Sequence, residues 1–213
     1  MAIIIYLVTV LMERTTSLAL TDALLAAVAL SMGVNRQLPV ALRLAGAIFS
    51  AAAVLGVLRF SGVYPLPTWH QFASMLAAVC AFPLLAVAVV FPDALATRTA
   101  RFAWIFMCLM AVLGVLVVAA GQKRLLADAL ALVSVLAVLL TLARSGHWSG
   151  AAGAALVLLG LLVFALKPPL GDVLQPGDWL HIGMAAGLLL LARLDLWPAL
   201  RSTPQQFSAP LPN

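Results

Sequence analysis

Residues 148–166 read WSGAAGAALVLLGLLVFAL, a run of nineteen residues without a charged side chain. A helix that crosses a membrane needs about 20 predominantly apolar residues. Inside a bilayer the backbone N–H and C=O groups must be hydrogen-bonded within the segment, because no water is there to satisfy them. An apolar run of this length therefore predicts a transmembrane α-helix.

Six further apolar runs of similar length fill most of the chain, at about 15–34, 40–60, 69–91, 101–120, 124–143 and 179–197. The sequence therefore predicts an all-α fold, a polytopic transmembrane bundle of seven helices joined by short loops. The five tryptophans support these limits, because tryptophan is enriched at membrane–water interfaces. They all lie at or near the ends of the runs: Trp69, Trp104, Trp148, Trp179 and Trp197.

The composition excludes a water-soluble domain. Of the 213 residues, 65% are hydrophobic and 9% are charged, and the mean hydropathy is +1.15. Soluble domains carry about 25% charged residues. The net charge of +5 is spread over the loops in ones and twos, which favours contact with membrane lipids and predicts no nucleic-acid partner. Cys80 and Cys108 lie inside apolar runs and form no C-x-x-C pair, so we expect neither a disulfide nor a zinc knuckle.

The predicted membrane domain covers residues 15–197. Residues 1–14 are apolar but too short to span, and they lack the basic start of a signal peptide. Three interpretations stay open for them: an interfacial helix, an extension of the first transmembrane helix, or translation from an over-early start, with Met12 the true first residue. Residues 198–213 are rich in proline and predict a short disordered tail.

The loop cations indicate the orientation. Five lie on the N-terminal side of the predicted bundle and seven on the other side. Because cytoplasmic loops carry an excess of lysine and arginine, this bias favours an N-terminus outside, in a multi-pass protein of the inner (plasma) membrane. The cations on the N-terminal side are Arg14, Arg59, Lys123, Arg124 and Lys167. Those on the other side are Arg36, Arg43, Arg98, Arg101, Arg144, Arg193 and Arg201.

A few ionisable residues fall inside or beside the apolar runs, all toward the outer end of the odd-numbered helices: Asp22, His70, Asp128, Asp178 and His181. Ionisable groups within a membrane are costly and usually functional. The N-terminal ends of these helices, with their partial positive charge, point to the same side. The pattern predicts a polar pocket in the outer half of the bundle.

The acids near the first and last runs have structural interpretations, while the histidine favours a functional one. Asp22 lies seven residues after Thr15, on a face with small residues, so it should point into the bundle and could merely tie two helices together. Asp178 follows Pro176-Gly177 and could be a helix N-cap. His181 shares a face with Asp178 one turn later, the arrangement in which a carboxylate orients a metal-binding or catalytic imidazole.

The third and fifth runs contribute weaker candidates. His70 and Ser74 are four residues apart and share a face; the histidine could be a ligand, a base or an interfacial anchor. Asp128 lies four residues after Arg124, so an ion pair would explain both residues. Pro83 lies in the middle of the third run and should kink that helix.

The chain resembles a group of uncharacterised bacterial seven-helix membrane proteins, distantly similar to the CREST superfamily of alkaline ceramidases and adiponectin-receptor-like proteins. The resemblance rests on Glu13-x-Thr15-Thr16 and Thr21-Asp22 in the first helix and Asp178-x-x-His181 at the start of the last helix. For the CREST families it implies a zinc-dependent amide or lipid hydrolase. Those hydrolases carry two histidines one turn apart on the last helix, and here the position four after His181 is Ala185.

Three functions therefore stay open. In a metal-dependent hydrolase of a lipid or other amphiphile, zinc would be held by His70, His181 and one carboxylate, Asp178 or Asp22, and would activate a water. Asp22, Asp128 and Ser74 are then the candidate catalytic groups. The alternatives are a non-enzymatic lipid-binding, small-solute-binding or transport component that uses the same residues, and a structural membrane subunit.

Overall fold

The computed structural model describes residues 2–64, 66–119, 123–168, 174–193 and Trp197, with side chains except at 2–14, 117–119 and 123–125. Every regular element in these ranges is a helix. In chain order they are α1 (Ala2–Val34), α2 (Val40–Phe60), α3 (Pro67–Leu76), the π-helix η1 (Ala77–Ala81), α4 (Phe82–Val90), α5 (Leu95–Arg98), α6 (Ala100–Ala119), α7 (Lys123–Arg144), α8 (Trp148–Leu166) and α9 (Pro176–Leu191).

The helices are those of an integral membrane protein. Five helical segments are long and apolar enough to cross a membrane: Thr15–Val34, Val40–Phe60, Pro67–Val90, Leu126–Arg144 and Trp148–Leu166. The remaining two predicted runs lie in α6, a helix of 20 residues of which Ala100–Leu116 are apolar and described with side chains, and in the 16 residues of α9. The all-helical membrane class is therefore confirmed, while the count of seven spans stays a prediction.

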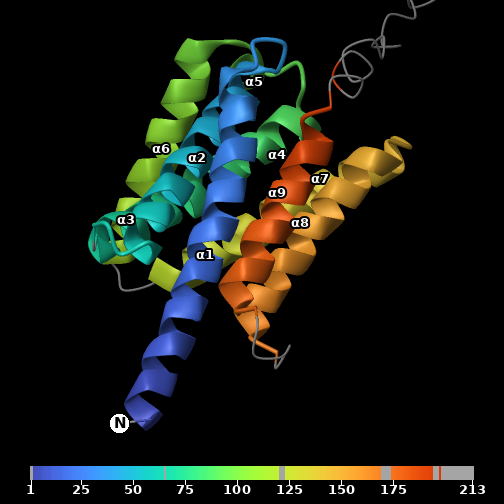
Figure 1. The fold of residues 1–213 in the computed structure, drawn as a ribbon. Coiled ribbons are helices and arrows are strands. Elements are labelled where there is room, and N and C mark those ends of the chain that lie inside the picture. Colours follow the sequence, from blue (N-terminus) through green and yellow to red (C-terminus); the bar gives the residue numbers. More distant parts are fainter. Residues whose placement is uncertain (1, 65, 120–122, 169–173, 194–196, 198–213) are drawn as a thin grey trace, which may run out of the picture.

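Helix α1 begins at Ala2 and continues without a break to Val34. The apolar residues 2–14 and the first predicted span therefore belong to one helix, whose first turns extend beyond the neighbouring helices (Figure 1). The predicted tail at 198–213 lies outside the described residues.

The third predicted run is interrupted by a π-helical turn at Ala77–Ala81, between α3 and α4. The Phe82 N–H donates to the Ala77 carbonyl five residues back. Pro83, which follows at once, has no N–H to donate and crowds the preceding turn of a regular α-helix. The wider π turn, with one extra residue, is one of the recognised ways in which a helix absorbs such a break.

Glycines let two pairs of helices approach closely, α1 with α2 and α8 with α9. A Cβ at Gly46 would lie 2.7 Å from the Ala29 carbonyl oxygen of α1. A Cβ at Gly153 would lie 2.8 Å from the Gly187 carbonyl oxygen of α9. Small residues at such crossings are the usual basis of helix association in membranes. Helix α1 also packs against α9, so the contact between α1 and α9 joins the two pairs (Figure 1).

Candidate functional site

One polar group of the bundle is the Asp178 carboxylate at the start of α9, which is fully buried. Gln175 is the N-cap of α9 and Asp178 is the third residue of the helix, and together they form a reciprocal capping box. The Gln175 backbone N–H donates to Asp178 Oδ2 at 2.8 Å. The interpretation of Asp178 as the N-cap was therefore wrong: the N-cap is Gln175, one turn earlier. Asp178 accepts a hydrogen bond from the N-cap backbone N–H as the third residue of the helix.

Two hydroxyls of α1 donate the other two hydrogen bonds that this carboxylate accepts. Ser17 Oγ donates to Asp178 Oδ2 at 2.9 Å, and Thr21 Oγ1 donates to Asp178 Oδ1 at 2.9 Å. Ser17 and Thr21 are four residues apart, so both face α9. Asp178 thus accepts three hydrogen bonds and ties the beginning of α9 to the middle of α1. This is the interhelical role that the sequence left open for the acids of the bundle.

Asp22 and His181 form a second buried contact between the same helices. Asp22 Oδ1 lies 3.3 Å from His181 Nδ1, and the side chains are 2% and 14% exposed. Thr21 Oγ1 lies 3.5 Å from the same ring nitrogen. Because Thr21 donates its proton to Asp178, it can only accept from His181. The two acids and the imidazole therefore belong to one hydrogen-bonded group.

The second carboxylate oxygen of Asp22, Oδ2, is buried and has no hydrogen-bond partner. Among the described residues it is the only buried side-chain nitrogen or oxygen atom without one. It faces Gly56 of α2, and a Cβ at that position would overlap Asp22 Oδ2 and lie 2.6 Å from Asp22 Cγ. Leaving a buried polar group unsatisfied costs about 1–3 kcal/mol, more when it is charged. A residue retained at that cost, on a membrane-spanning helix, is a candidate for function.

A third polar group lies where α2 ends and α3 begins. Arg59 Nη1 lies 3.0 Å from His70 Nδ1, and an arginine can only donate, so this ring nitrogen accepts. The proton of the neutral ring is then on Nε2, which is 3.5 Å from Ser74 Oγ. Phe60 packs edge-on against the imidazole, with centroids 5.5 Å apart.

The structure brings together three of the six residues that the sequence singled out. Asp22, Asp178 and His181 are linked by the Asp22–His181 contact and through Thr21, whereas His70 contacts Arg59 at the junction of α2 and α3. Ser74 is exposed and donates its hydroxyl proton to the His70 carbonyl at 2.8 Å. Asp128 lies at the exposed surface of α7. Catalytic roles for these two residues stay predictions.

No protein-family model, curated protein or solved structure matches this chain. The resemblance to the CREST superfamily therefore stays a proposal. Within the described ranges, no group of three or more histidine, cysteine, aspartate and glutamate side chains is arranged to hold a metal ion. Asp178 already accepts three hydrogen bonds, which leaves about one of the four lone-pair sites of the carboxylate for its predicted role as a metal ligand.

Sequence reasoning missed part of this site. Arg59 was counted only as a loop cation, and Gly56 was not considered at all. Ser17 could have been found, because it lies one turn before Thr21, and two hydroxyls at that spacing share a helix face. Gln175 could also have been found, since an acid three residues after a polar N-cap residue is the sequence signature of a capping box.

Proposed function

We propose that this integral membrane protein is a non-enzymatic solute-binding or transport component, and that Asp22 and His181 together bind and release a proton inside the bundle. The observation that carries the proposal is the buried Asp22 carboxyl group, which contacts His181 with one oxygen and has no partner for the other. Ionisable groups in this situation within membranes mark proton relays and solute pathways.

The chemistry of the pair supports a proton-binding role. A carboxylate oxygen and an imidazole nitrogen 3.3 Å apart need to move only a few tenths of an ångström to share a proton in a hydrogen bond, and histidine accepts and donates protons near neutral pH. The pair is neutral when a proton is held between a carboxylate and a neutral imidazole, and it carries one negative charge when that proton leaves. In a low-dielectric site this change in charge is costly and must be balanced by the surroundings.

A neighbouring acid is placed to respond to that change. Thr21 of α1 links Asp178 of α9 to the pair, because its hydroxyl donates to Asp178 Oδ1 at 2.9 Å and lies 3.5 Å from His181 Nδ1. Gain or loss of a proton at the pair therefore alters the electrostatic balance between α1 and α9, which is how a titrating site can be coupled to helix movement or to binding of a solute.

The proposal is tested in proteoliposomes that contain a pH-sensitive dye. We expect a pH gradient imposed across the membrane to drive proton uptake with the wild-type protein and not with Asp22→Asn, which keeps the shape of the side chain and removes its proton chemistry. Asp128→Asn removes an exposed acid and serves as the matched control, with uptake unchanged. Equal uptake by the wild type and Asp22→Asn would overturn the proposal.

A metal-dependent hydrolase is a second proposal, and the contact between two of its candidate ligands, Asp22 and His181, favours it. It predicts stoichiometric zinc in protein purified without chelators, and loss of that zinc in His181→Ala. Zinc content that is negligible in the wild type, or equal in the wild type and the variant, would remove it.

A further inference from the structure

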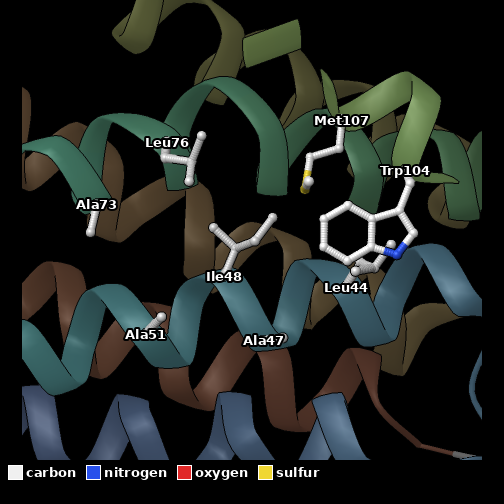
Figure 2. Close-up of a pocket in the computed structure, with 8 residues that line it drawn as sticks. All are labelled: Leu44, Ala47, Ile48, Ala51, Ala73, Leu76, Trp104 and Met107. Carbon is white, nitrogen blue, oxygen red and sulfur yellow. The ribbon is translucent and has the colours of Figure 1, made fainter. Parts of the chain in front are cut away.

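An apolar groove lies on the outside of the bundle, between α2, α3 and α6. Its volume is about 260 Å³, below the roughly 300–1,000 Å³ of pockets that enclose a whole small molecule. Figure 2 shows Ala51 and Ala73 at one end and Leu44 and Trp104 at the other. The remaining lining residues are Ala47, Ile48, Leu76 and Met107.

The groove opens to the surroundings of the protein. Ala47 and Ala51 are exposed, and Trp104 is 51% exposed although it lines the groove. The small alanine side chains of α2 form its floor, and the indole ring of Trp104 lies across its end (Figure 2). Because α2 is a membrane-spanning segment, the medium that meets this groove is lipid hydrocarbon.

The position of the groove along the helices corresponds to one leaflet. Leu44 lies four residues after the start of α2 and Trp104 four residues after the start of α6, about 6 Å into the membrane at 1.5 Å per residue. Ala51 lies eleven residues after the start of α2, about 16 Å deep, close to the middle of a hydrocarbon core about 30 Å thick. The groove thus runs from the aromatic belt to the bilayer centre, the depth that one acyl chain occupies.

Positive charge lies at the shallow end of the groove. Arg101 is exposed and precedes Trp104 by three residues, so the two share a face of α6. Two other arginines have partners within the protein: Arg98 forms an ion pair with Asp93 at 2.6 Å, and Arg43 donates one of its N–H groups, Nε, to the Gly33 carbonyl at 3.4 Å. Within the described part of the chain, the Arg101 guanidinium has no such partner.

We infer that the groove is a binding site for an anionic phospholipid, with one acyl chain along α2 and the phosphate on Arg101. Three features of the site complement such a lipid. The apolar groove, one leaflet deep, fits an acyl chain. The Trp104 indole lies in the aromatic belt, and the Arg101 guanidinium can bind the phosphate. This site shares no residue with the Asp22–His181 pair, so the inference goes beyond the proposed function and does not depend on it.

The test uses quenching of Trp104 fluorescence by brominated acyl chains, taken as the difference between the wild type and Trp104→Phe. Brominated phosphatidylglycerol and phosphatidylcholine with the same chains are compared in mixed bilayers. We expect the Trp104 signal to report a preference for phosphatidylglycerol. Arg101→Gln should reduce that preference about fivefold, because one cation near an anionic surface contributes about 1 kcal/mol.

Arg144→Gln is the matched control, since Arg144 is exposed at the end of α7, and it should leave the preference unchanged. Ala51→Leu fills the groove and should weaken quenching by both lipids; Ala47→Leu is the substitute if that variant does not fold. Equal quenching by the two lipids, with no effect of Arg101→Gln, would show only non-selective boundary lipid and overturn the inference. Absence of any quenching of Trp104 would mean that protein covers the groove, and would overturn it equally.

Discussion

The contact between Gly56 and Asp22 gives the sharpest test of the site geometry. A methyl group at Gly56 would overlap Asp22 Oδ2 and press on Cγ and Oδ1, so Gly56→Ala must push the carboxyl group or α2 aside. Overpacking of this kind costs about 1–3 kcal/mol. In an Asp22→Ala background all three of these atoms are absent, and the same substitution should cost almost nothing.

The assay is a double-mutant cycle of unfolding free energies, measured by circular dichroism in mixed micelles titrated with dodecyl sulfate. We expect a coupling energy of about 1–3 kcal/mol between positions 22 and 56, typical of residues in direct contact. Gly46→Ala is the matched control, because a Cβ there meets backbone atoms of α1, the Ala29 carbonyl at 2.7 Å and the Gly33 nitrogen at 2.9 Å. Its cost should be the same in both backgrounds. If Gly56→Ala is equally harmful with and without the Asp22 side chain, the carboxyl group does not face Gly56 and the reasoning fails.

Three further outcomes are expected from the same unfolding assay. Thr21→Val should cost about 1–3 kcal/mol, because it leaves the buried Asp178 carboxylate without one of its three donors, whereas Thr21→Ser should be close to wild type; equal losses in both would contradict the hydroxyl role. Gly153→Ala should cost about 1–3 kcal/mol by forcing α8 away from α9, and a neutral result would contradict their close approach. Asp93→Asn should change stability by less than about 1 kcal/mol, because the Asp93–Arg98 pair is more than half exposed and exposed ion pairs contribute little; a larger loss would show that the pair is part of a buried network.

The helical membrane fold was predictable because of a strong physical constraint. Apolar runs near 20 residues long have few solutions other than helices in a bilayer, and the structure places a helix in each of the seven runs. The convergence of Asp22, Asp178 and His181 could be predicted for a related reason, since polar groups on membrane helices avoid lipid and therefore face one another.

The rest of the site depends on which helices are neighbours and how each is rotated, and a single sequence contains little information about either. Gly56 meets Asp22 only because α2 packs against α1 at that height. Arg59 reaches His70 only because α3 folds back along α2. The position of Asp178 within its helix depended on a boundary shift of a few residues, the least reliable feature of any sequence prediction. Pro83 predicted a break in its helix, but the π turn that accommodates it is a property of the folded chain.

The central claim is that the Asp22 carboxyl group binds and releases a proton inside the bundle. Infrared difference spectroscopy of the protein in lipid bilayers measures this directly, because a protonated carboxylic acid and a carboxylate absorb at different frequencies. The account predicts a carboxylic acid band that changes reversibly with pH, is absent from Asp22→Asn, is shifted by His181→Ala and is unaffected by Asp128→Asn. A spectrum in which Asp22→Asn removes no titrating band would contradict the account.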